Sequence, residues 1–183
     1  GRVPLTFERV KGLLNELAEN DVREFWVSGG KEPLVNPIAP YAIQYATDLG
    51  LAVQFYTNGI RMSKSVQEKI LGCRQIRISL NAATPETYKQ VQGINGDNFN
   101  LVVKNIGELV KLKKERGSQA NIGISFLLNE FNYKEILKIA DIAKSLGVDF
   151  LAIYSEQVGT IRRFTQEEAG EILNSLETIR LNK

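Results

Sequence analysis

The sequence of 183 residues contains no histidine and a single cysteine, Cys73. The lack of histidine excludes Ser-His-Asp triads, histidine general bases and histidine-ligated metal sites. One cysteine cannot form an intramolecular disulfide, and such cysteine usage is typical of a reducing compartment. We therefore expect a cytoplasmic protein.

The chain also lacks an excess of one charge and a long hydrophobic run. It carries 23 Lys and Arg against 21 Asp and Glu, and this net charge of +2 indicates no preference for nucleic acid or a membrane surface. No apolar run is long enough to span a bilayer, and the N-terminus lacks a signal-peptide pattern. The length and the 43% hydrophobic content suit one core, so we expect a single domain over residues 1–183.

What the sequence does contain is a regular alternation of helical and strand patterns. Near-continuous apolar runs predict strands at residues 22–28, 51–57, 75–80, 121–128 and 149–154. Apolar spacing, caps and glycines predict helices from Thr6 to Asn20, Asn36 to Gly50, Ser65 to Gly72, Thr84 to Gly93, Phe99 to Gly117, Asn132 to Gly147, and from Thr165 onward. This alternation predicts an α/β fold with a parallel sheet and right-handed crossovers.

Helix starts and core positions can also be read from the pattern. Reciprocal capping pairs are predicted for Ser65 with Glu68, Asn132 with Glu135, and Thr165 with Glu168. The expected core contains Leu13, Leu17, Val27, Ile78, Leu80, Ile106, Ile124, Phe126, Leu137 and Ile153.

Polar residues follow each predicted strand at its carboxyl end. They are Ser28 to Glu32, Thr57 and Asn58, Ser79 and Asn81, Asn129, and Ser155 and Glu156. A barrel or part-barrel would bring these ends together at one mouth, where ligands bind in such folds. A doubly wound sheet would not gather all of them.

The stretch from Phe25 to Leu34 is an apolar run that ends in two glycines, followed by Glu32 and Pro33. Paired glycines allow backbone to come close to a ligand, because no Cβ stands in the way. Glu32 and the loop carbonyls are acceptors that suit a cationic donor such as an ammonium group. Taken alone, the stretch also fits an ordinary strand-to-helix turn.

No strand precedes the first predicted helix, which leaves one edge of strand 22–28 without a partner. Exposed apolar edges are usually paired or protected. We therefore expect that a preceding strand is absent from this chain, or that another segment covers the edge. The chain also stops after a helix, so we expect an excerpt of a larger protein.

Three segments in order resemble the radical S-adenosylmethionine (radical SAM) enzymes. They are residues 28–34 (Ser-Gly-Gly-Lys-Glu-Pro-Leu), 56–59 (Tyr-Thr-Asn-Gly) and 76–88 (Ile-Arg-Ile-Ser-Leu-Asn-Ala-Ala-Thr-Pro-Glu-Thr-Tyr), and the similarity continues through 138–153. The resemblance implies a partial (β/α)6 TIM-like barrel with parallel strands whose first strand is missing from the chain. It implies an enzyme that binds a [4Fe-4S] cluster, cleaves SAM reductively and uses the 5′-deoxyadenosyl radical to abstract hydrogen. Its expected partners are a peptide or small-molecule substrate and an electron donor such as flavodoxin or ferredoxin.

The resemblance also implies which residues bind SAM. Gly29, Gly30 and Glu32 match the motif that holds the methionine ammonium, and Lys31 stands where many relatives have a third glycine or none. The other positions implied to lie near SAM are Thr57, Asn58, Ser79, Asn81, Ser125, Ile153 and Tyr154. Relatives often carry Asp where Asn81 stands, so its amide could bond a hydroxyl without adding charge.

The sequence departs from the family because the Cys-x3-Cys-x2-Cys cluster motif is absent. Its ligands are expected upstream of Gly1, since Cys73 alone cannot hold a cluster that takes several cysteines. Two alternatives from other classes remain open. One is a catalytically inactive SAM-fold binding or scaffold module. The other is an unrelated TIM-like aldolase or isomerase that uses Lys31 and Glu32.

Overall fold

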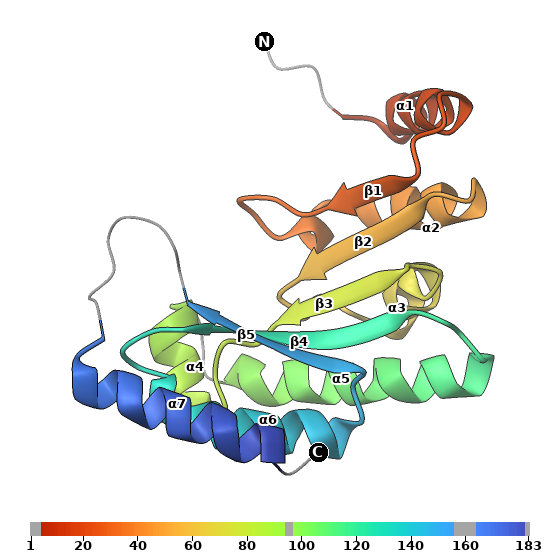
Figure 1. Cartoon of the computed structure of the whole chain (residues 1–183). Helices are drawn as coiled ribbons and strands as arrows, with labels where there is room; N and C mark the ends of the chain where they lie inside the picture. The colour runs from red at the N-terminus through yellow and green to blue at the C-terminus, as the bar shows by residue number, and fades with distance from the viewer. Residues whose placement is uncertain (1–4, 94–96, 156–163, 182–183) are drawn as a thin grey trace.

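The computed structural model describes residues 5–93, 97–155 and 164–181. Its centre is one sheet of five parallel strands in chain order (Figure 1). The strands are β1 (Glu24–Val27), β2 (Ala52–Thr57), β3 (Gln75–Ser79), β4 (Asn121–Leu128) and β5 (Phe150–Ser155). The predictions of five parallel strands, of their order and of an α/β fold are confirmed.

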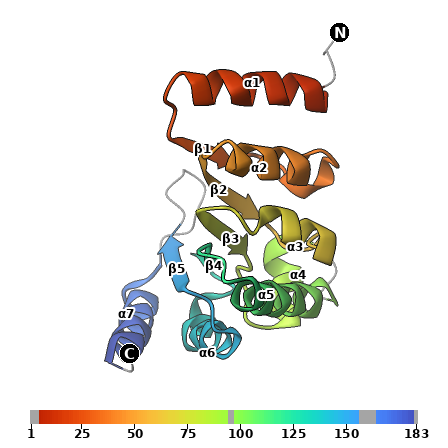
Figure 2. The same ribbon diagram turned by 90° about the vertical axis from the view of Figure 1, so that its right-hand side faces the viewer.

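The helices form an outer layer around this sheet. They are α1 (Phe7–Glu19), η1 (Pro33–Val35), α2 (Ala39–Asp48), α3 (Lys64–Ile70), α4 (Pro85–Gln92), α5 (Asp97–Arg116), η2 (Tyr133–Glu135), α6 (Ile136–Leu146) and α7 (Gln166–Leu181). Figure 2 shows the strands curving as an inner wall with the helices outside. The sheet is not closed, because among the described residues no strand pairs with the free edge of β1 or of β5.

The two faces of the sheet differ because successive side chains of a strand point to opposite sides. On β2 and β3 every second residue is buried, including Phe55, Ile76 and Ile78 at 0% exposure. These side chains pack under the helices. The alternate residues, among them Tyr56 and Arg77, are only half-buried and face the concave inner side. The inner face is therefore free to take up functional side chains.

Most of the expected core is confirmed. Leu80, Ile106, Ile124 and Phe126 are 0% exposed, as is Ile78. Leu17, Val27 and Ile153 are partly buried and pack against the core.

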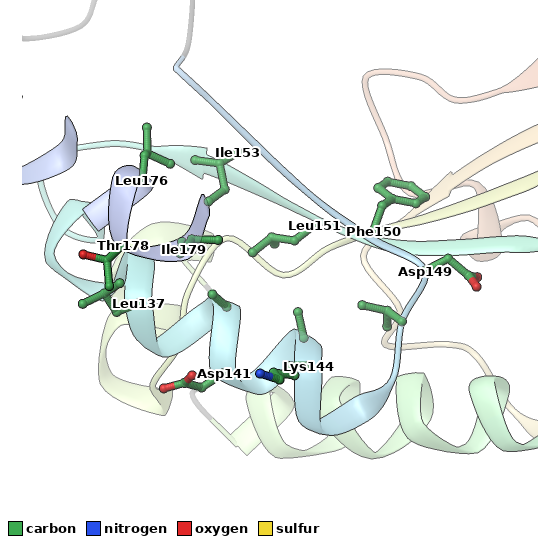
Figure 3. A pocket seen from close by; sticks show the side chains of 13 residues that line it. Leu137, Asp141, Lys144, Asp149, Phe150, Leu151, Ile153, Leu176, Thr178 and Ile179 are labelled. Atoms are coloured by element: carbon green, nitrogen blue, oxygen red, sulfur yellow. The ribbon is translucent and has the colours of Figure 1, made fainter. Parts of the chain in front are cut away.

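The core predictions for Leu13 and Leu137 are wrong, since these side chains are 50% and 43% exposed. On α1 the buried residues are Val10 and Leu14, and Leu13 lies about 100° around the helix from Leu14. Leu137 borders a cavity of about 880 Å³ between β5, α6 and α7 (Figure 3). In both cases helical spacing was satisfied, but too few neighbouring elements cover the outer side.

Several helix starts also differ from the predictions. The predicted capping pair Ser65–Glu68 is wrong, because the N-cap of α3 is Ser63 and Ser65 lies inside the helix. A 3-10 turn precedes α2, which starts at Ala39 and not after Asn36. Asn132 and Glu135 do not cap α6, because their side chains bond to other loops.

Other caps are confirmed. The hydroxyls of Thr6 and Thr84 accept bonds from the first turns of α1 and α4. Thr165 and Glu168 form the reciprocal box, with distances of 2.7 and 3.2 Å. In each case the capping hydroxyl bonds within the first turn of its own helix.

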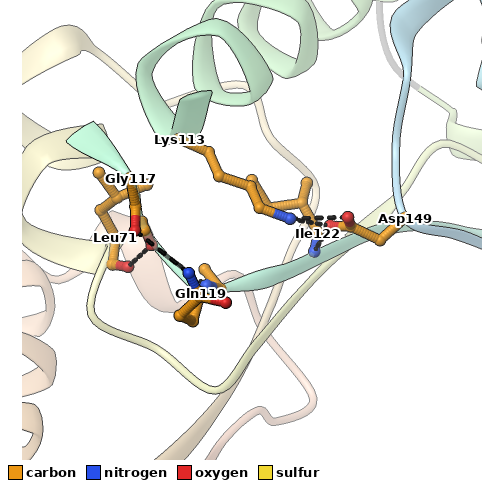
Figure 4. Close-up of polar contacts among 8 residues, drawn as sticks. Leu71, Lys113, Gly117, Gln119, Ile122 and Asp149 are labelled. Carbon is orange, nitrogen blue, oxygen red and sulfur yellow. Dashed lines mark hydrogen bonds and ion pairs between the residues drawn. The ribbon is translucent and has the colours of Figure 1, made fainter. Parts of the chain in front are cut away.

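At the amino-terminal end of the sheet, an ion pair connects α5 with the start of β5 (Figure 4). Lys113 Nζ lies 2.6 Å from each oxygen of Asp149, and the amide of Ile122 donates to the same carboxylate at 2.7 Å. Partial burial opposes ionisation, but these hydrogen bonds hold the pKa of Asp149 below its ordinary value. This contact stabilises the end of the sheet away from the polar residues.

We expect Ile78→Ala or Ile124→Ala to lower the free energy of unfolding by about 2–5 kcal/mol, because each removes methyl groups from a fully buried site. Chemical denaturation of the full-length protein measures this. The control Leu13→Ala should change stability by only about 0.5 kcal/mol, because that side chain is half exposed. Equal losses for the core and control variants would contradict this description of the core.

Candidate functional site

The carboxylate of Glu32 connects the loop after β1 with the end of β2. Its Oε1 accepts hydrogen bonds from the amide of Leu34 at 2.9 Å and the hydroxyl of Thr57 at 2.8 Å. Its Oε2 accepts from the amide of Asn58 at 2.7 Å. Glu32 is extended before Pro33 and serves as the N-cap of η1, so its backbone is fixed as well as its side chain.

This arrangement leaves limited but defined capacity on the carboxylate. An ionised carboxylate has about four lone-pair positions. Two bonds reach Oε1 and one reaches Oε2. Glu32 therefore keeps about one acceptor position, on Oε2, in a fixed orientation and in a half-buried place. A cationic N–H donor suits that position.

The turn after β2 is built to hold this contact. Thr57 is only 3% exposed, and its oxygen also accepts from the amide of Gly59 at 3.1 Å. Asn58 Oδ1 accepts from the amide of Ile60 at 3.0 Å. Gly59 has φ +76°, and a Cβ there would lie 2.9 Å from Ile78 Cγ2. Glycine is required at this turn by both backbone and packing.

Gly29 and Gly30 contrast with Gly59. Neither has a positive φ, and a Cβ on Gly30 would meet nothing within 4 Å. A Cβ on Gly29 would meet only the carbonyl of Lys31 at 3.9 Å. Nothing in the described part of the chain therefore demands glycine here, and both residues are exposed beside Glu32. Open space of this kind fits the close approach of a ligand.

Ser79, the last residue of β3, and Ser125, in the middle of β4, lie side by side on the inner face. They are register partners, and Ser125 Oγ is 3.3 Å from Ser79 Oγ. Ser125 is 0% exposed, whereas Ser79 is half-buried. Of the two hydroxyls, that of Ser79 is therefore the one that reaches the surface of the site.

Asn81 shapes the loop after β3. It has φ +54°, a left-handed conformation in which asparagine is enriched, and its Oδ1 accepts from the amide of Leu127 at 2.9 Å. Its carbonyl accepts from Asn132 Nδ2 at 2.9 Å. The side-chain oxygen is thus engaged with β4, and only the amide nitrogen remains for another partner.

Two residues that the sequence suggested as helix caps hold this loop instead. Glu135 accepts from the amide of Ala83 at 2.7 Å and from the hydroxyls of Thr84 and Thr87 at 2.9 and 3.0 Å. Asn132, at 0% exposure, bonds Asn81 across 51 positions of sequence. The Asn-x-x-Glu spacing was visible, but it does not reveal such distant partners.

Ile153 does not join the other predicted site residues. Its side chain lines the cavity between α6 and α7 on the outer face, as Figure 3 shows. Tyr154, the next residue, is 42% exposed, and strand alternation puts it on the inner face. Glu156 lies outside the described residues.

The described residues do not fit an iron–sulfur cluster. They contain no group of three or more His, Cys, Asp or Glu that could hold a metal ion. Cys73 is 2% exposed and precedes β3, at the end of the sheet opposite Glu32. Burial raises the pKa of its thiol to about 12, so it is protonated at neutral pH and is not a ready metal ligand.

No described helix is long and apolar enough to cross a membrane.

Comparison with known proteins gives one family. The profile of the radical SAM superfamily matches residues 2–149. A dTDP-4-amino-4,6-dideoxy-D-glucose ammonia-lyase from Streptomyces venezuelae is 27% identical over 177 residues, covering 91% of this chain and 36% of that protein. An AdoMet-dependent heme synthase from Methanosarcina barkeri is 30% identical over 145 residues, covering 78% of this chain and 39% of that protein. The chain thus spans little more than a third of these relatives.

Solved structures support the same fold. SuiB from Streptococcus suis bound to S-adenosylmethionine aligns with a TM-score of 0.76 at 16% identity, covering 99% of this chain and 42% of SuiB. SuiB bound to its precursor peptide SuiA gives 0.74 at 15% identity, covering 98% and 41%. At such identities the likeness shows the fold alone.

The buried thiol of Cys73 gives a pH-dependent prediction. Its pKa is raised in the folded state, so between about pH 9 and 12 the folded state keeps a proton that the unfolded state loses. Stability from this group is complete below pH 9 and falls as the pH rises. The stability difference between the parent and Cys73→Ala should therefore shrink by up to about 1.4 kcal/mol per pH unit above pH 9. Denaturation at pH 7.5 and at pH 10 measures it, and a constant difference would contradict the buried neutral thiol.

Proposed function

The chain belongs to the radical SAM superfamily, and we propose that it is the SAM-binding part of a radical SAM enzyme. The observation that carries this proposal is the carboxylate of Glu32, fixed by three donors and left with about one acceptor position beside two exposed glycines. That is a suitable receptor for the ammonium group of the methionine moiety.

We propose these roles for the residues around Glu32. The backbone of Gly29, Gly30 and Lys31 would line the ammonium, and the Lys31 side chain is exposed. Thr57 and the amide of Asn58 hold Glu32 in place, as their bonds to it indicate. Superfamily members use SAM with a [4Fe-4S] cluster to make 5′-deoxyadenosyl radicals, and SAM held by these residues would supply that hydrogen-abstracting chemistry.

Farther along the sheet, Ser79 would offer its hydroxyl to the ribose or carboxylate of SAM, and buried Ser125 would orient that hydroxyl. Asn81 would donate only through its amide nitrogen, because its oxygen is bonded to β4. Tyr154 remains a candidate for the adenine on the inner face. Ile153 lines the outer cavity, which argues against the same role for it.

The described residues themselves do not fit the cluster. We propose that cysteines elsewhere in the full-length protein hold it, as the family pattern requires. An electron donor such as flavodoxin or ferredoxin and a cytoplasmic location are part of the same proposal.

The substrate class is proposed as a small molecule or peptide. The ammonia-lyase is named for a sugar nucleotide, and one SuiB structure holds a precursor peptide. The alternative of an aldolase with a Schiff-base lysine is disfavoured, because Lys31 is exposed and such a lysine is activated by desolvation.

We expect Glu32→Ala in the full-length, reconstituted enzyme to weaken SAM binding by roughly ten- to a hundred-fold, since a charge-assisted hydrogen bond is lost. Calorimetry with SAM measures this, and the absorbance of the cluster should be retained. Reductive cleavage of SAM should fall with the affinity. Equal SAM affinity for the parent and Glu32→Ala would refute the assignment of this loop.

Two further variants separate direct binding from loop support. Thr57→Val keeps the carboxylate but removes one of its donors, so SAM affinity should fall less than in Glu32→Ala. Glu86→Ala removes an exposed carboxylate from the first turn of α4 and should leave SAM affinity unchanged. Thermal unfolding of each variant checks that the fold is intact.

A further inference from the structure

Arg77 stands on the inner face of β3 among aromatic rings. Its guanidinium carbon lies 5.1 Å from the ring centroid of Tyr56 on β2 and 5.7 Å from that of Phe150 on β5. Tyr56 in turn packs against Trp26 on β1, with centroids 5.9 Å apart. The row therefore crosses the sheet from β1 to β5 with one cation in it.

Phe150 reaches Arg77 only because β4 carries a glycine between them. Gly123 is the register partner of both Arg77 and Phe150. A Cβ at Gly123 would overlap the ring of Phe150. The space above Gly123 is thus filled by the ring that flanks the guanidinium, and the side chain of Arg77 is held between two neighbours.

The charge of Arg77 has no counter-ion within the described chain. It takes part in none of the ion pairs there, and its Nε is buried without a hydrogen-bond partner. The terminal nitrogens are not among the fully buried, unpartnered atoms, and the side chain as a whole is half-buried. Native proteins rarely leave such donors unpaired, so each instance needs an explanation.

The ring contacts of Tyr56 and Phe150 provide no hydrogen-bond acceptor for the N–H donors at the edge of the guanidinium. That edge presents a planar fork of N–H donors that matches the oxygens of a carboxylate or a phosphate group. Cation–π contacts hold the cation in place without neutralising it. The most direct occupant is an anionic group of a ligand.

The position of Arg77 indicates which ligand this is. Arg77 lies two residues before Ser79 on the same face of β3. It is therefore about 6.6 Å farther from the carboxyl end of the strand than Ser79 is. It is thus below the rim where Glu32 and Ser79 would hold SAM. An anion bound at this depth would belong to a second molecule on the inner face.

We propose that Arg77 binds the anionic group of the substrate, a phosphate or a carboxylate, on the inner face of the sheet. This rests on the proposed function and deepens it by naming a chemical class of substrate. Tyr56 and Phe150 act as positioning residues for the guanidinium, and Gly123 provides the space for Phe150.

The test is anion binding to the folded full-length protein by calorimetry, with inorganic phosphate and succinate as probes at constant ionic strength. Saturable binding of one probe is expected, and the probe that binds distinguishes a phosphate from a carboxylate site. Arg77→Gln should weaken that binding by roughly ten- to a hundred-fold. Lysine has no Nε–H of the arginine type, so the resonance absent from the spectrum of arginine-labelled Arg77→Lys identifies Arg77. In the parent protein, that Nε–H resonance should shift when the probe binds.

Arg74 provides the matched control. It precedes the same strand, its side chain is 71% exposed, and it lies 3.9 Å from Glu24. Arg74→Gln should bind both probes as the parent does. If Arg77→Gln fails to fold, Arg77→Lys keeps the charge without the planar fork and should still bind the probe more weakly than the parent.

Two results would overturn the inference: no saturable binding of either probe to the parent, or equal binding by the parent and Arg77→Gln. SAM affinity measured on the same preparations reports on the proposed function separately. Anion binding through Arg77 without SAM binding would keep this site and reject the proposed function. SAM binding without anion binding would keep the proposed function and reject the anion site at Arg77.

Discussion

The fixed carboxylate of Glu32 is the contact on which the candidate site depends. One side chain accepts bonds from its own loop and from the end of the neighbouring strand, at 2.7–2.9 Å. This joins two loops that the parallel sheet merely brings near each other. All three donors to Glu32 are uncharged N–H or O–H groups, and the spare position on Oε2 is oriented before any ligand arrives. Pre-orientation reduces the entropy cost of binding.

The two ends of the sheet are used differently, as is common in parallel α/β folds. At the amino-terminal end, Lys113, Asp149 and the amide of Ile122 satisfy one another, and Cys73 is buried as a neutral thiol. At the carboxyl end, acceptors and hydroxyls remain partly accessible. Asn132 and Glu135 connect the loops there, so the polar residues gain a rigid frame. Substitutions at the amino-terminal end of the sheet can therefore change stability without changing the residues of the candidate site.

The sequence predicted the fold well because its signals are local and repeated. All five strands were placed within two residues of their observed bounds, since each is a short apolar or alternating segment between turn residues. Leu13 and Leu137 failed because spacing gives the apolar face of a helix but not what covers it. Glu135 failed for a related reason: its spacing fits a cap, whereas its partners lie 48 to 52 positions away. Glu32 could be proposed as a site residue because its glycine pair and proline mark the loop within the sequence itself.

The inner-face arginine illustrates a further limit of reading a sequence locally. Residues 75–79 alternate Gln, Ile, Arg, Ile and Ser, and a surface strand would look the same. Only the register places Gly123 beside Arg77 and brings Phe150 over that glycine. The guanidinium then lies among rings that hold it without neutralising it. An uncompensated charge in a half-buried place costs free energy in the unbound state, and that cost is recovered when an anion binds.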